Sequence, residues 1–326
     1  MKFGIQPTEG GHYFRESLEE VLLAEELGFD SAWLSEHHGV ADHYWGTPLL
    51  CLAGWAARTS KIVVASNVIV LPFYNPIRVA EEAAFLDSMS DGRFILGVGM
   101  GYREDEFQMF GVEVKSRGAR YEEGLKILKQ AIDTGRAELA GRFHQVTGFR
   151  LEPRPPRRIP IWAGGWGAEN LRRAALYTDV WLPGPVGDLP KVLDCQRIYE
   201  EQRTAAGLPI PEERPLTREL VIAETDEKAR EAAQKYMLHN YSDEYAGSWN
   251  HPLFAGKTGD QSDVNTFGVN RFIVGSPTSV IAQIQSYVRL FGVNHLIFRL
   301  FAPGTPHEFV LREIELLGRE VLPAFG

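Results

Sequence analysis

Short apolar runs alternate with longer amphipathic stretches along almost the entire chain. The short runs are rich in Val, Ile, Phe and Trp and favour buried strands, whereas the longer stretches repeat apolar residues every three or four positions and favour helices. In the first half, this alternation predicts strand and helix pairs at 2–5 and 14–27, 31–35 and 47–58, 62–70 and 77–88, and 94–98 and 120–132.

The second half of the chain continues the alternation. It predicts pairs at 159–163 and 168–176, 179–182 and 189–206, 216–223 and 228–239, and 295–301 and 307–322. Eight such units favour the α/β class and a (β/α)8 TIM barrel, because a doubly wound sheet usually stops at about six strands. No linker separates two cores, so residues 1–326 are expected to form a single domain.

Two segments interrupt the repeat. Residues 141–156, which run into the Pro/Arg-rich EPRPPRR of residues 152–158, predict an extended excursion, and the polar residues 242–275 predict a long insertion before the last strand, followed by a helix at 278–291. A structureless segment of that length is typically a functional lid or a linker. We expect residues 242–275 to close over the mouth of the barrel, with a static surface loop as the alternative.

Composition and charge narrow the class of partner. The 43 acidic and 34 basic residues give a net charge of −9, and the basic residues are scattered, which argues against nucleic acid and anionic membranes as partners. No apolar run approaches the ~20 residues of a membrane helix. Cys51 and Cys195 form no CxxC pair and no secretory segment is recognisable, so we expect a cytoplasmic protein that acts on a small molecule.

The stretch WLSEHHG places Glu36, His37 and His38 where a predicted strand ends, which is the active-site face of a β/α barrel. No HxH, HExxH or Cys pattern supplies further metal ligands, so we expect no metal. The histidines either pack as hydrogen-bonded residues or take part in acid–base chemistry. Adjacent strand residues face opposite sides, so Glu36 or His37 is expected to be structural unless the strand has already ended.

Two other strand ends carry candidate binding groups. Asn67 and Val68 end one apolar run, and the sequence GVGMG follows another. The spacing of GVGMG does not match a dinucleotide fingerprint, and no helix follows it at once. Glycines let a backbone approach a ring system, so Gly99, Met100 and the neighbouring Tyr102 are candidate cofactor contacts.

A third strand end, at Gly164, Gly165 and Trp166, comes just before a predicted helix. The N-terminal amides of a helix favour an anion, although glycines there are also typical of a plain tight turn. Arg117 or Arg120 would be the side chains that hold the same anion.

Several segments together resemble the bacterial luciferase-like monooxygenases over nearly the entire chain. They are, in order, KFGI, GFDSAWLSEHH, ASNVIVLPFYNPIRVAEEAAFLDSMSDGRFILGVGMGY, EFQMFGV, PIWAGG, VGSP, GVNHLIF and EVLP. The resemblance implies a (β/α)8 barrel that binds reduced FMN at the strand ends, and relatives of the family use a deazaflavin coenzyme.

The resemblance also implies roles for the strand-end residues. The first histidine of the EHH motif is His37, which implies a catalytic base or a group that positions flavin and oxygen, with Glu36 and His38 as its supporting partners. Asn67 and Val68 match the position of a non-proline cis peptide beneath the flavin ring. Met100 stands where luciferases carry an arginine for the FMN phosphate, which leaves the deazaflavin open.

The function implied is monooxygenation of a small, largely apolar organic substrate by reduced FMN and dioxygen. A separate flavin reductase and a homodimer follow from the same resemblance. The alternatives are a deazaflavin-dependent oxidoreductase that transfers hydride on the same barrel, and a non-catalytic flavin-binding subunit. The presence of His37 and the lid-like residues 242–275 argue against the last of these.

Overall fold

The computed structural model describes residues 1–40, 44–238, 241, 251–253 and 263–326. Most of the segment 242–275 lies outside the described residues, so the lid expected there is not addressed by the structure.

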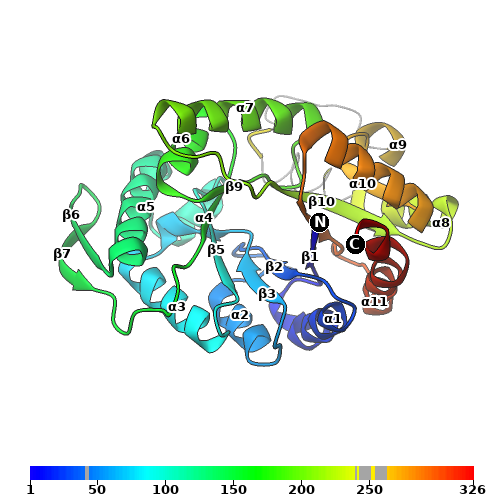
Figure 1. Ribbon diagram of the computed structural model, residues 1–326, viewed down its shortest axis with the longest axis horizontal. Coiled ribbons are helices and arrows are strands. Elements are labelled where there is room, and N and C mark those ends of the chain that lie inside the picture. Colours follow the sequence, from blue (N-terminus) through cyan, green and yellow to red (C-terminus); the bar gives the residue numbers. More distant parts are fainter. Residues whose placement is uncertain (41–43, 239–240, 242–250, 254–262) are drawn as a thin grey trace.

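Parallel strands ring the centre of the molecule and helices surround them (Figure 1). In the described part of the chain, the paired strands follow the order β11-β10-β12-β1-β2-β3-β5-β8-β9, with the short β4 beside β5. The Thr217 amide of β10 donates to the Pro183 carbonyl, just after β9, at 3.2 Å and so links the two flanks of the ring. This arrangement confirms the predicted TIM barrel. The strands are β1 Lys2–Gln6, β2 Ser31–Leu34, β3 Val63–Ser66, β4 Ile69–Val70, β5 Phe94–Gly99, β8 Ile161–Gly164, β9 Val180–Leu182, β10 Pro215–Ile222, β11 Phe272–Gly275 and β12 His295–Arg299.

The barrel strands are almost entirely buried, because both faces of a parallel sheet are covered, and most of their residues are apolar. β10 is the exception, with the buried polar run Thr217, Arg218 and Glu219 at its centre. The helices that cover the barrel expose their polar faces, and none in the described ranges is long and apolar enough to cross a bilayer. They are α1 Phe14–Glu26, α2 Pro48–Ala56, α3 Pro76–Met89, α4 Glu104–Met109, α5 Arg117–Thr134, α6 Ala168–Tyr177, α7 Leu189–Ala205, α8 Asp226–Ala232, α9 Val264–Phe267, α10 Pro277–Phe291 and α11 His307–Leu316.

The structure corrects both predicted interruptions. The excursion begins before residue 141, because β6 Arg136–Ala140 and β7 Gln145–Arg150 form an antiparallel hairpin that projects from the barrel (Figure 1). The predicted insertion 242–275 ends too late: Phe272–Gly275 is strand β11, which pairs in parallel with residues 219–222 of β10. A run this short is not separable by periodicity from the polar loop before it.

At the end of the barrel opposite the strand carboxyl ends, a polar chain runs from the exposed Lys2 into the buried interior. Lys2 donates to both carboxylate oxygens of Glu213, at 3.0 and 3.1 Å, and Glu213 Oε1 lies 2.9 Å from Nδ1 of His295. His295 Nε2 lies 2.7 Å from the hydroxyl of Ser31, which also accepts from the Trp33 indole at 2.7 Å. These contacts tie β1, β2 and β12 to the segment that leads into β10.

We expect this polar chain of side chains to make the free energy of unfolding depend on pH in the acidic range. Burial alone would raise the pKa of Glu213, but hydrogen bonds from His295 and Lys2 outweigh it and lower that pKa to about 2. A lowered folded-state pKa contributes stability above the unfolded value, which is lost as the pH falls toward 2, by an amount of up to about 3 kcal/mol. Urea unfolding should show Glu213→Gln less stable than the wild type at pH 7 and the two converging between pH 4.5 and 2. Parallel curves over that interval would contradict this assignment.

Candidate functional site

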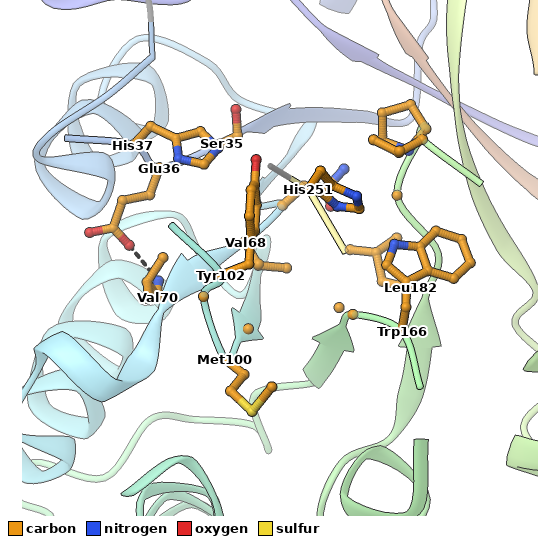
Figure 2. Close-up of a pocket in the computed structure, with 18 of the residues that line it drawn as sticks. Ser35, Glu36, His37, Val68, Val70, Met100, Tyr102, Trp166, Leu182 and His251 are labelled. Atoms are coloured by element: carbon orange, nitrogen blue, oxygen red, sulfur yellow. Dashed lines mark hydrogen bonds between the residues drawn. The ribbon is translucent and has the colours of Figure 1, made fainter. Parts of the chain in front are cut away.

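A pocket opens at the carboxyl ends of the barrel strands (Figure 2). The loops after β2, β3, β5, β8 and β9 and the last residue of β12 supply most of its wall. Among the lining residues are Gln6, Ser35, Glu36, His37, Tyr44, Asn67, Val68, Val70, Gly99, Met100, Tyr102, Glu106, Arg117, Gly164, Gly165, Trp166, Asn170, Leu182, Val186, His251 and Arg299.

Glu36 anchors the loop after β2. Its carboxylate, only 2% exposed, accepts from the amide of Val70 and the hydroxyl of Tyr74 and lies 2.8 Å from Nε2 of His38. Burial raises the pKa of Tyr74, which keeps its hydroxyl protonated as a donor. Because β2 ends at Leu34, both Glu36 and His37 line the pocket. The strand-based expectation that one of the two faces away therefore does not apply.

His37 is held by a carboxylate that the sequence analysis missed. Its Nδ1 lies 2.8 Å from Oε1 of Glu106, the same oxygen that accepts from the His38 amide at 2.9 Å and from Arg103 at 3.3 Å. Although burial raises the pKa of Glu106, these partners lower it overall, so the carboxylate stays charged. A charged Glu106 fixes the proton of a neutral His37 on Nδ1 and makes Nε2 the basic nitrogen.

Aromatic rings fix the plane of the His37 ring. Tyr44 lies edge-on to it, with ring centroids 4.6 Å apart, and Tyr102 does so at 5.8 Å. His38 is not among the lining residues: it packs on Phe110, with ring centroids 4.5 Å apart, behind the wall of the pocket.

The floor of the pocket is nearly free of large side chains. The Asn67–Val68 peptide bond is cis, as the resemblance implied, and Val68 lies in the floor (Figure 2). A Cβ on Gly97 would overlap the Ser66 carbonyl oxygen, and a Cβ on Gly99 or Gly164 would come within 2.5 or 3.0 Å of Val68. Gly99 and Gly164 thus leave room for the Val68 side chain on two sides and add no side chain of their own to this part of the pocket.

One end of the pocket is suited to an anion. Arg117 lines it; its buried Nε has no hydrogen-bond partner among the described residues, while one Nη donates to the Val114 carbonyl at 3.0 Å. Gly164, Gly165 and Trp166, just before α6, also line the pocket, and Figure 2 labels Trp166 among its lining residues. Asn170 of the first turn of α6 donates to the Gly164 carbonyl at 2.9 Å and so fixes the backbone there; its side-chain oxygen is an acceptor and would not bind an anion.

Arg120 does not join this end of the pocket. It donates to the Ser116 hydroxyl at 3.1 Å and its guanidinium stacks on Phe143, 4.6 Å from the ring centroid. Of the two arginines that the sequence offered for an anion, only Arg117 is a lining residue.

Two more lining residues were missed from the sequence. Arg299 is the last residue of β12, so the strand-end rule that selected His37 would also have selected it. His251 packs edge-on against Tyr102, with ring centroids 4.6 Å apart (Figure 2). Burial lowers the pKa of His251 to about 3, so its ring is neutral. A lone histidine in a long polar segment gives no pattern from which to select it.

The described residues contain no group of three or more His, Cys, Asp or Glu side chains placed to hold a metal ion.

Comparison with known proteins places the chain in a family. Residues 1–294 match the family model for luciferase-like monooxygenases. The uncharacterized protein y4vJ of Sinorhizobium fredii is 35% identical, over 49% of this chain and 46% of that protein, so this chain spans about half the length of that relative. An F420-dependent glucose-6-phosphate dehydrogenase of Amycolatopsis mediterranei is 26% identical, over 99% of this chain and 98% of that enzyme.

The crystal structure of the monooxygenase RslO1 from Streptomyces bottropensis has the same fold. It superposes with a TM-score of 0.85 and 26% sequence identity, covering 100% of both chains. The family match, over most of the chain, and this superposition agree with the order of the motifs in the sequence. The chain therefore belongs to the luciferase-like monooxygenase family and is an oxidoreductase.

Proposed function

We propose that the protein is a flavin-dependent monooxygenase that uses reduced FMN and dioxygen to oxygenate a small, largely apolar organic substrate. The observation that carries the proposal is the His37–Glu106 pair, 2.8 Å apart, beside the floor at Val68. A ring system on that floor would lie within reach of a basic nitrogen whose proton state is fixed by a buried carboxylate.

The pocket fits the group that the family implies. The floor around Val68 would accept a planar ring, with Asn67, Gly99, Met100 and Tyr102 beside it. Arg117 Nε would supply a charge-assisted hydrogen bond to a phosphate, and the backbone at Gly164, Gly165 and Trp166 would supply further contacts before α6. When bound, reduced flavin supplies the electrons that activate dioxygen.

The chain's own residues would position the substrate and control protons. We assign His37 Nε2 to accept or return a proton at the substrate, with Glu106 stabilising the charged ring. Glu36 and His38 support this loop from behind by their 2.8 Å contact. Tyr102, His251 and Val186 would exclude water from the site.

A deazaflavin-dependent oxidoreductase remains the second candidate. The observation that favours it is Met100, which stands in the pocket wall where an arginine was expected for FMN, together with the F420-dependent relative.

We expect the purified protein to bind reduced FMN at least 10-fold more tightly than reduced F420, titrated anaerobically by fluorescence. Oxygen is then admitted with substrate, and an oxygenated product is expected with FMN only. Tight F420 binding with an oxygen-independent hydride transfer would establish the second candidate instead.

The remaining parts of the proposal follow the family. A separate reductase would deliver the reduced FMN, the protein would act in the cytoplasm, and the whole chain would fold as one domain. A homodimer would cover Leu50 of α2 and Phe85 of α3, which are 73% and 66% exposed beside one groove. A non-catalytic subunit is disfavoured, because it would have no use for the paired His37 and Glu106.

A further inference from the structure

We propose that Glu9 fixes, through Gln6, the orientation of the Asn67 side chain, so that the Asn67 amide oxygen accepts a hydrogen bond from an N–H group that the flavin gains on reduction. Glu9 is then a positioning residue, and Asn67 makes the floor of the pocket bind reduced flavin in preference to oxidised flavin. The inference rests on the proposed function, because it takes flavin as the ligand of this floor.

Glu9 lies behind the wall of the pocket, since it is 1% exposed and is not among the lining residues. Its Oε1 accepts from the amide and the hydroxyl of Ser35, at 2.7 and 2.6 Å, and its Oε2 accepts from Nε2 of Gln6 at 3.1 Å. The Nε of Arg299 lies 3.8 Å from Oε2 and pairs with the charge of the carboxylate. A carboxylate has only acceptors, so Ser35 and Gln6 must both turn donors toward it.

Gln6 carries this direction on to Asn67. Both hydrogens of Gln6 Nε2 are used, one by Glu9 and one by the Ser35 hydroxyl oxygen at 3.2 Å. Gln6 Oε1 therefore faces Asn67 and accepts from its Nδ2 at 3.4 Å. The other hydrogen of Nδ2 is donated to the Thr217 hydroxyl oxygen at 2.9 Å. A hydroxyl can donate or accept, so Thr217 is compatible with either orientation of the amide, and Gln6 sets which one is adopted.

The side chains of Gln6, Ser35 and Asn67 all line the pocket, and Figure 2 shows Ser35 in its wall. The donors of these three side chains are used inside the protein, by Glu9 and Thr217 and by one another. In the described part of the chain, no residue donates to Oδ1 of Asn67. Because Asn67 directly precedes Val68, this part of the floor offers a ligand a side-chain acceptor and no side-chain donor.

The two redox states of a flavin differ in the group that such an oxygen can bind. In the oxidised ring, the nitrogens that take part in reduction are acceptors, and reduction adds a hydrogen that turns one into an N–H donor. The Asn67 oxygen forms a hydrogen bond with an N–H group, whereas it meets a second acceptor at an oxidised ring nitrogen. Hydrogen bonds from a protein to the ring nitrogens tune the electronic properties of a flavin. The orientation set by Glu9 therefore favours the reduced ring.

The test measures the affinities for reduced and for oxidised FMN by anaerobic calorimetry, and the midpoint potential of the bound FMN by spectroelectrochemistry. Glu9→Gln replaces an acceptor-only group by one that can also donate, so the Gln6 and Asn67 amides can turn. We expect the ratio of reduced to oxidised affinity to fall about 10-fold, which lowers the midpoint potential by about 30 mV for a two-electron couple. Loss of a negative charge alone would act in the opposite direction, because it favours the electron-rich reduced ring.

Asn67→Ala removes the oxygen directly and should lower the same ratio about 10-fold, so it decides the question even if Glu9→Gln does not fold. Glu219→Gln is the matched control. Glu219 is also a buried carboxylate paired with Arg299, at 2.8 Å, but it does not line the pocket, and its other hydrogen bond comes from Tyr241. We expect Glu219→Gln to keep the ratio of the wild type.

Three results would each overturn the inference while FMN binding itself persists. They are an unchanged ratio in Asn67→Ala, an unchanged or higher ratio in Glu9→Gln, and equal shifts in Glu9→Gln and Glu219→Gln. A wild-type protein that binds neither form of FMN would overturn the proposed function and this inference together.

Discussion

His37→Ala is expected to lower turnover by ~10²–10⁴-fold while the affinity for reduced FMN stays nearly unchanged, because a positioned acid–base group acts on rate more than on binding. The ring is fixed by Glu106 and by two tyrosines, so its loss removes the one basic nitrogen that this pair holds at the floor. Turnover is measured as oxygenated product at saturating reduced FMN and dioxygen, and affinity by anaerobic titration.

Two further variants sharpen the interpretation. His12→Ala removes an exposed histidine that is not among the lining residues and should change neither quantity. Glu106→Gln keeps a hydrogen-bonding side chain beside His37 and removes its charge, so the acidic limb of the pH–rate profile, which reports the catalytic base, should move while FMN affinity remains. Unchanged turnover in His37→Ala would reduce His37 to a packing residue.

Arg117→Ala is expected to weaken FMN binding by about 10- to 100-fold, because a charge-assisted hydrogen bond to phosphate contributes roughly 1.5–3 kcal/mol. Riboflavin has the same ring and no phosphate, so its affinity should be unaffected. Arg120→Ala on the same helix is the control, since Arg120 packs on Phe143 outside the pocket. Equal losses for both flavins would show that Arg117 shapes the pocket without binding phosphate.

The barrel could be predicted from the sequence because its signal is repeated. Buried parallel strands are mostly apolar, and the helices between them are amphipathic. A wrong boundary for one strand or helix therefore leaves the overall alternation, and the fold that it predicts, unchanged. The short strand β11, Phe272–Gly275, could not be found in the same way. Its partner is the far half of β10, a pairing between distant residues that no local pattern encodes.

The site was predictable where it depends on strand ends and unpredictable where it depends on distant contacts. His37, Val68 and Gly164 follow strands and were identified. Glu106 reaches His37 from a separate helix, α4, and only the folded chain brings the two together. Arg120 was selected by residue type alone; although it lies three residues after Arg117 on α5, its guanidinium stacks on Phe143 and does not line the pocket.

The glycines beside Val68 also affect the entropy of binding. Gly97, Gly99 and Gly164 have no side-chain torsions to freeze, and the β-branched Val68 has few rotamers available even before a ligand binds. A planar ring that binds at this floor would therefore cost almost no side-chain conformational entropy in the residues beneath it. By contrast, Leu182 and His251, which also line the pocket and which we place around the substrate, have side-chain torsions that must be fixed when a ligand is enclosed. The entropic penalty of binding would therefore fall on the substrate step, and substrate affinity would respond to changes in wall flexibility that leave flavin affinity unaltered.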